Sequence, residues 1–343
     1  MNVVQNDALP PTVASPSGIP LARRILRPRT LISFAIGLLI LGFGVSRLNI
    51  DIAGTLRVIG SANWRLYFAA FVVYYCAFPV RALRWRRMLE NTGYRRQELP
   101  GLLVLGEIIF LSWFVNGLVP AKLGDVYRAY VLRQRSIISG SKGGGTIVAE
   151  RLLDLAVMLV LLGIAGLLSF RGRLPSTVLT VIEFGFALVL VAGVGLLMMR
   201  RLEPLIRRFI PARFQMLYEH FQDGTLGAFG HYPELLGLTL LAWGIETARL
   251  YLVTQAIGVA LSPNLALNLL MVMFIALGEA LLTAPPGTPA GLGYVEATIV
   301  GALVLLHIPQ TVALSIALLD RSISFLSIVV LGFFVYLYSQ RHA

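Results

Sequence analysis

Residues 120–126 read PAKLGDV and residues 289–295 read PAGLGYV, so the two stretches share the pattern P-A-x-L-G-x-V. Each lies in the middle of a long apolar segment, at about residues 101–131 and 265–306. Proline removes a backbone donor and glycine loosens the backbone, so we do not expect one continuous helix through either centre. At membrane depth such a break is tolerated where it is buried in protein or lines a wet cavity. The residues that we expect at the two tips are Pro120, Gly124, Pro289, Gly291 and Gly293.

The constant spacing of the two patterns predicts an internal repeat with halves at about residues 64–170 and 233–338. A chance match between common small residues is the alternative interpretation. Paired segments interrupted by glycine and proline, one in each half of a chain, are the best indication in a sequence of a transporter's substrate site.

Composition limits the fold class. The chain has 343 residues, of which 57% are hydrophobic and only 13% charged, and its mean hydropathy is +0.78. A soluble domain carries about twice that share of charge, so these values exclude a water-soluble globule, a disordered chain and a disulfide scaffold. With one cysteine and scattered histidines, we expect no disulfide and no metal site. We predict an all-α polytopic membrane protein with about six full transmembrane helices and two re-entrant hairpins.

The positive charge predicts the topology. The net charge of +12 is spread between apolar runs, which is typical of the positive-inside bias and not of nucleic-acid binding. If the two broken segments are re-entrant, most of the 29 basic residues fall on the cytoplasmic side together with both termini, among them Arg81 and Arg84 in the loop that follows the second crossing. The hairpins then enter from opposite faces, the first from the cytoplasm, as an inverted repeat. The six predicted crossings are residues 30–48, 64–81, 146–169, 177–199, 233–258 and 312–338.

The segments outside the crossings divide the chain further. We expect a disordered cytoplasmic tail at residues 1–29, one transmembrane domain at 30–338 and a cytoplasmic tail at 339–343. Residues 200–231 predict a cytoplasmic amphipathic segment, with a helix that opens at Pro211 and ends before Gly224. The glycine-rich stretch 140–145 does not match a phosphate-binding loop, and we interpret it as a flexible turn before a helix.

Ionisable groups inside a membrane cost at least about 2.5–3.5 kcal/mol each, so they must be paired or wet. Several lie near the tips or in the apolar runs, and Arg151 is spaced to reach Asp154 along one helix. One interpretation is that they line a shared cavity that binds substrate. The other is that they form structural salt bridges between helices. The candidate substrate-binding residues are Asn116, Lys122, Asp125, Arg128, Glu150, Arg151, Asp154, Glu296, Asp320 and Arg321.

A cavity of this kind would suit a lipid headgroup. Helices that begin at Gly124 and Gly293 would point N-terminal amides into the membrane, where they favour phosphate or carboxylate. The basic side chains add positive charge, and the acidic ones suit an ammonium group or a coupled proton. The sequence carries no nucleophile motif and no ATP-binding motif, so we expect no catalytic residues and no cofactor.

An ordered set of motifs also resembles a known family. The motifs are Arg81–Trp85 (RALRW), Asn116–Pro120 (NGLVP), Gly124–Arg128 (GDVYR), Glu150–Asp154 (ERLLD) and Pro289–Gly293 (PAGLG), with Glu296 and Asp320-Arg321. Together they resemble the flippase-like family of the lysylphosphatidylglycerol synthase transmembrane region, the membrane part of the multiple peptide resistance factor. The family pattern at the second tip is usually closer to P-G-G-x-G, from which this chain departs at Ala290.

The resemblance implies membrane helices with broken segments that move a lipid, or a lipid-linked sugar, between leaflets. Because no soluble domain follows residue 338, lysyl transfer is not expected. Two other functions stay open: an enzyme or enzyme subunit of lipid or glycolipid biosynthesis, and a scaffold for such enzymes. The expected partners are a phospholipid or polyprenyl-linked lipid, and the expected location is the plasma membrane.

Overall fold

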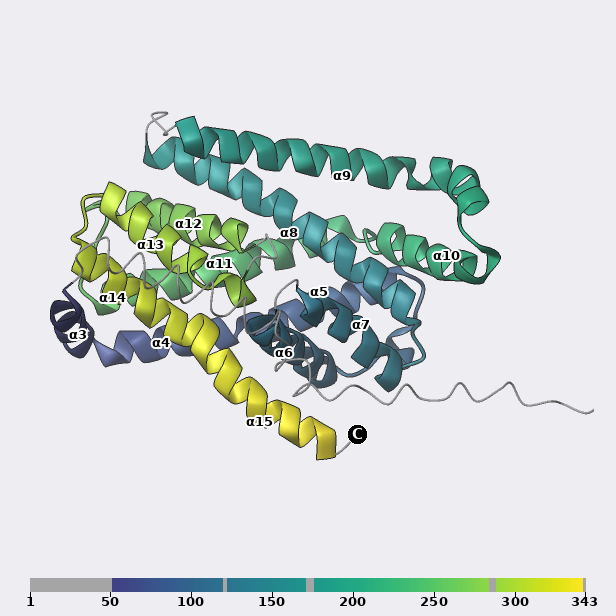
Figure 1. The fold of residues 1–343 in the computed structure, drawn as a ribbon, viewed down its shortest axis with the longest axis horizontal. Helices are drawn as coiled ribbons and strands as arrows, with labels where there is room; N and C mark the ends of the chain where they lie inside the picture. Colours follow the sequence, from purple (N-terminus) through teal and green to yellow (C-terminus); the bar gives the residue numbers. More distant parts are fainter. Residues whose placement is uncertain (1–50, 120–121, 171–175, 284–287, 342–343) are drawn as a thin grey trace, which may run out of the picture.

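The computed structural model describes residues 51–119, 122–170, 176–283 and 288–341, and among these it contains helices and turns but no strand (Figure 1). The predicted all-helical membrane fold is confirmed. The α-helices are α3 (Ile52–Gly60), α4 (Trp64–Tyr75), α5 (Ala77–Asn91), α6 (Leu102–Leu118), α7 (Leu123–Arg135), α8 (Gly140–Ser169), α9 (Ser176–Phe209), α10 (Ala212–Gly227), α11 (Tyr232–Ala256), α12 (Leu265–Leu282), α13 (Tyr294–Leu305), α14 (Gln310–Arg321) and α15 (Ser327–Arg341). Two 3-10 turns, η1 (Arg96–Glu98) and η2 (Pro289–Gly291), and a π-helical turn, η3 (Ser322–Leu326), complete the described elements.

Six helical stretches are long and apolar enough to cross a membrane. Five of them, formed by α4–α5, α8, α9, α11 and α14–α15, match predicted crossings. The sixth is α12, which the sequence analysis placed within the second hairpin. The predicted crossing at residues 30–48 and the tip residue Pro120 lie outside the described residues.

The helix that begins at Trp64 runs further than predicted. With a bend at Cys76 it continues to Asn91, past the predicted end at residue 81. Arg81 and Arg84, which the charge analysis assigned to a cytoplasmic loop, are therefore inside the fold, and their side chains are buried.

Both broken segments fold as helical hairpins. In the first, α7 turns back along α6, so that Arg135 at its end lies 3.1 Å from Glu107 near the start of α6. In the second, α13 turns back along α12, and Gly291 lies against Thr283. That the two hairpins are re-entrant, and the membrane face from which each would enter, stay predictions.

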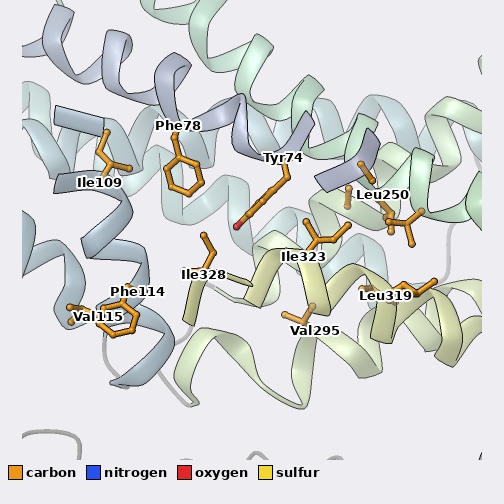
Figure 2. Close-up of a cluster of buried hydrophobic side chains, with 14 of the residues drawn as sticks. Tyr74, Phe78, Ile109, Phe114, Val115, Leu250, Val295, Leu319, Ile323 and Ile328 are labelled. Atoms are coloured by element: carbon orange, nitrogen blue, oxygen red, sulfur yellow. The ribbon is translucent and has the colours of Figure 1, made fainter. Parts of the chain in front are cut away.

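A buried apolar cluster holds the two hairpins against the long helices. Figure 2 shows side chains of α4 and α5 facing those of α6 on one side and those of α13 to α15 on the other. Tyr74 lies at its centre and donates a hydrogen bond to the Ser324 carbonyl oxygen over 3.1 Å, within the π-helical turn η3. A π-helical turn is a frequent mark of a functional site.

Glycines allow α8 and α10 to pack closely against each other. A Cβ on Gly145 would lie 2.3 Å from the Phe221 carbonyl oxygen, and one on Gly224 would lie 2.2 Å from that of Lys142. Two predictions are therefore wrong. Residues 140–145 are the first turns of α8, not a flexible turn, and Gly224 lies within α10, not after it. The helix does start directly after Pro211, as expected.

Candidate functional site

A cavity of about 410 Å³ lies between the tips of the two hairpins. Its volume is in the range of small-molecule sites, about 300–1,000 Å³. Aromatic side chains from three helices, Tyr74, Trp113 and Trp243, form part of the wall. The charged side chains that line the cavity are Arg81, Lys122, Asp125, Arg151, Asp154, Glu246, Arg249, Glu279 and Arg321.

The tip of the first hairpin is held by Asn116. The Gly124 amide at the start of α7 donates to Asn116 Oδ1 over 2.8 Å, which closes the turn from α6. Lys122 precedes α7 in the left-handed conformation, with φ 51°. A Cβ on Gly124 would lie 2.0 Å from the Ser112 carbonyl oxygen, so only glycine allows the two helices to approach this closely.

We expect Gly124→Ala to open the first hairpin and to destabilise the protein by at least about 1–3 kcal/mol, the usual cost of overpacking. The measurement is the midpoint of thermal unfolding in detergent. Gly144→Ala in α8 is the matched control, because a Cβ there meets nothing within 4 Å. Equal midpoints for the two variants would contradict the close approach.

A two-pronged ion pair connects the first hairpin to α8. Arg151 donates through Nε and Nη2 to the two carboxylate oxygens of Asp125, over 3.0 and 2.8 Å. The expected pairing of Arg151 with Asp154 is wrong, because the Asp154 side chain points to another helix. Two parallel hydrogen bonds hold the carboxylate in one orientation relative to the guanidinium group, so this pair fixes the orientation of the first turn of α7.

Behind this pair lies a second network. Arg84 donates to Glu150 over 2.8 Å and also to Asp154, so these two carboxylates share one face of α8. Arg128 lies 2.8 Å from Glu150 and 3.7 Å from the centre of the Trp85 ring. All these charged side chains are buried, and each has an opposite charge at hand.

The tip of the second hairpin is closed by Glu296. The Gly293 amide donates to Glu296 Oε2 over 2.7 Å, and Arg321 donates to Glu296 Oε1 over 2.8 Å and to the Ala290 carbonyl oxygen over 3.1 Å. Ala290 and Gly291 have φ of 47° and 69°. Ala290 thus adopts a conformation that favours glycine, so the departure from P-G-G keeps a glycine-like turn at the expense of strain.

These contacts change the expected role of the helix N-termini. The amides of Gly124 and Gly293, which were expected to face a phosphate, already donate to Asn116 and Glu296. The positive charge that a ligand meets in the cavity therefore comes from side chains.

Arg249 is the centre of the charge cluster in the second half. It lies 2.7 Å from Glu279, 3.1 Å from Asp320 and 3.7 Å from Glu246. Arg81 lies 3.1 Å from Glu246. Three carboxylates thus share two guanidinium groups, and all five side chains are buried.

The two halves repeat one ion-pair pattern. In each half, a carboxylate in the first turn of the hairpin's second helix pairs with an arginine of the next helix: Asp125 with Arg151, and Glu296 with Arg321. The positions differ slightly relative to the P-A-x-L-G-x-V tips, because Asp125 directly follows Gly124 whereas Glu296 lies three residues after Gly293. Chance similarity of small residues would not reproduce such contacts, so they support the internal repeat.

The residue before each of these arginines continues the pattern. Glu150 precedes Arg151, and Asp320 precedes Arg321. Glu150 contacts Arg84 of α5, and Asp320 contacts Arg249 of α11, which are the helices before the two hairpins. In both halves, therefore, an acidic–basic dipeptide forms ion pairs with two other helices. In the first half these are α5 and α7, and in the second half they are α11 and α13.

The predicted residues separate into two groups. The first group, which lines the cavity, is Asn116, Lys122, Asp125, Arg151, Asp154, Gly291 and Arg321. The second, which supports it from behind, is Arg128, Glu150, Glu296 and Asp320. The predicted list of site residues did not include Arg81, Arg84, Glu246, Arg249 and Glu279, which the structure adds to the site. The RALRW motif and the spacing of Glu246 and Arg249 were the signals for four of them.

Among the described residues, no group of His, Cys, Asp or Glu side chains is arranged to hold a metal ion.

Comparison with known proteins gives a consistent result. The family model described as the lysylphosphatidylglycerol synthase transmembrane region matches residues 30–332. A UPF0104 membrane protein of Methanocaldococcus jannaschii is 35% identical over 233 residues, which cover 67% of this chain and 95% of that protein. A UPF0104 membrane protein of Methanothermobacter thermautotrophicus is 27% identical over 317 residues, covering 86% and 87%.

One relative has a name that states an activity. The glycosyltransferase AglD of Haloferax volcanii is 29% identical over 344 residues, which cover 88% of this chain. The chain spans 53% of that protein, about half its length. No solved structure matches.

Proposed function

Because this chain belongs to the family of the lysylphosphatidylglycerol synthase transmembrane region, we propose that it moves a phospholipid or lipid-linked headgroup between leaflets. The headgroup would pass through the charged cavity between the two hairpin tips while the acyl chains stay in lipid. We place the protein in the plasma membrane with both termini in the cytoplasm.

The cavity between the tips is the observation that carries this proposal. Ionisable groups inside a membrane are rare and usually mark a substrate or ion pathway. Here the tip of the first hairpin and five long helical stretches contribute charged side chains to one cavity. Aromatic and aliphatic residues, among them Trp113, Leu155 and Ile328, line the rest of it. A wall of both characters suits a molecule with a polar head and apolar tails.

Leaflet exchange in liposomes tests the proposal. Purified protein should speed the exchange of a phospholipid with a fluorescent acyl chain between leaflets. A membrane-impermeant reductant quenches only the label in the outer leaflet, so the rate at which the remaining fluorescence is lost measures the exchange. Glu296→Gln should slow exchange at least tenfold, because it removes the partner of Arg321 at the second tip. Arg57→Ala is the control, since its ion pair with Asp51 is exposed. Exchange no faster than in empty liposomes, across phospholipids and polyprenyl phosphates, would contradict the function.

The glycosyltransferase relative supports a second candidate, an enzyme or enzyme subunit of glycolipid biosynthesis. The carboxylates that would act as acid or base are Asp125, Glu150 and Asp154. Each already forms an ion pair with an arginine, which leaves no free carboxylate among the three. A covalent change in a lipid-linked sugar, produced by purified protein and detected by mass spectrometry, would favour this candidate over transport.

A further inference from the structure

Two charges in the cavity depart from the pattern that the halves share. The first is Lys122, which occupies the variable third position of P-A-x-L-G-x-V, where the second half has Gly291. Lys122 lines the cavity and forms no ion pair with any of the described residues within 4 Å. An ammonium group at the tip of the first hairpin is thus available to a ligand.

The second departure is Glu279. The helix before each tip contains Leu-Gly-Glu, at residues 105–107 and 277–279. Glu107 pairs with Arg135 and is not among the residues that line the cavity. Glu279 is three residues closer to the proline of its own tip, almost one helical turn, and it does line the cavity.

Glu279 brings an excess of negative charge to its part of the cavity. It shares Arg249 with Glu246 and Asp320, and Arg81 is the one further guanidinium in contact with these three carboxylates among the described residues. Glu279 is buried, and its Oε2 accepts no hydrogen bond from the described residues. A buried carboxylate without full compensation must take up a proton or receive a cation.

The other charged side chains on the elements packed around Glu279 already have partners. Arg249 and Glu246 come from α11, Arg321 and Asp320 from α14, and α13 contributes Glu296, which pairs with Arg321. Helix α8 also packs against α12 and contributes Arg151, which pairs with Asp125, and Asp154, which pairs with Arg84. The aromatic rings nearby contact the guanidinium groups: Arg81 lies 4.9 Å from the Trp113 ring centre, and Arg249 lies 5.4 Å from that of Tyr74.

We propose that the cavity selects a zwitterionic phospholipid with a primary amine, whose phosphate binds Lys122 and whose ammonium binds the carboxylate of Glu279. This inference rests on the proposed function, for which it names the substrate class. One free cation and one excess carboxylate in the same cavity match the two charges of such a headgroup. An anionic headgroup without an amine would satisfy Lys122 and leave Glu279 uncompensated.

The test compares phosphatidylethanolamine with its N-acetyl derivative, which keeps the phosphate and loses the ammonium. In liposomes, wild-type protein should exchange the amine lipid at least tenfold faster, since hydrogen bonds to charged groups contribute about 1.5–3 kcal/mol. Glu279→Gln should bring this ratio close to one. Glu107→Gln, the matched change in the first half, should keep the wild-type ratio. Lys122→Gln should slow both lipids.

A binding measurement separates this inference from the proposed function. Short-chain forms of the two lipids are added to detergent-purified protein, and the unfolding midpoint is recorded, because a ligand of the native state raises it. Selective stabilisation by the amine lipid, lost in Glu279→Gln, would support the inference even if no lipid moved in liposomes. Equal stabilisation by both lipids, or a Glu279→Gln variant that slows both by one factor, would overturn it.

Discussion

Replacement of Arg84 by alanine is expected to destabilise the protein by about 3–5 kcal/mol, the largest effect of any single substitution considered. The Arg84 side chain is 0% exposed and donates to Glu150, Asp154 and Thr239. Its removal leaves the buried carboxylates of Glu150 and Asp154 without full compensation of their negative charge. A buried charge without a partner costs far more than the pair contributes.

The measurement for Arg84→Ala is the midpoint of thermal unfolding in detergent, together with the yield of folded protein from membranes. Arg87→Ala is the matched control on the same helix, because the Arg87 side chain is 38% exposed where it contacts Glu90 and Glu234. Exposed pairs contribute about 0–1 kcal/mol, so the control should be nearly neutral. Arg84→Lys should also be destabilised, since one ammonium cannot replace a fork that bonds two carboxylates. Similar midpoints for Arg84→Ala and Arg87→Ala would contradict the role of Arg84.

The backbone of the site could be predicted from local sequence. Proline and glycine act on their own residue and its neighbours, so PAKLGDV and PAGLGYV were enough to place both breaks. The repeat pattern also led to the hypothesis that charged residues from the two halves line one cavity. These features depend on short stretches of chain, which a sequence shows directly.

The partners of the charged side chains could not be predicted in the same way. Arg151 is spaced to reach Asp154 along α8, but tertiary packing places Asp125 within reach of both its donor nitrogens. Arg81 and Arg84 read as a basic cluster at the cytoplasmic surface, because the sequence did not show that the helix continues to Asn91. Contacts between helices depend on the rotation and depth of each helix, which local spacing does not determine.

Neutralisation of Arg151 is expected to slow lipid movement strongly while it leaves the fold nearly intact. The Arg151 side chain is 38% exposed, so we expect Arg151→Gln to cost only about 1 kcal/mol of stability. The effect on exchange should be on the order of a hundredfold. Asp125 would then present an unpaired carboxylate to the phosphate in the cavity, and two like charges 4 Å apart repel by about 4 kcal/mol at an effective dielectric constant near 20.

A compensating change tests this reason directly. In Asp125→Asn/Arg151→Gln the unpaired carboxylate is gone, so the rate of exchange should recover to within a few-fold of wild type. Such non-additive effects of two substitutions on the exchange rate are expected only for residues in contact, and Asp125 and Arg151 form a two-pronged ion pair. A double variant as slow as Arg151→Gln would mean that Arg151 itself binds the headgroup, and a wild-type rate for Arg151→Gln alone would remove the pair from the pathway. Because Arg321 and Glu296 repeat this pair at the second tip, the same rescue in Glu296→Gln/Arg321→Gln would make both hairpins parts of one transport path.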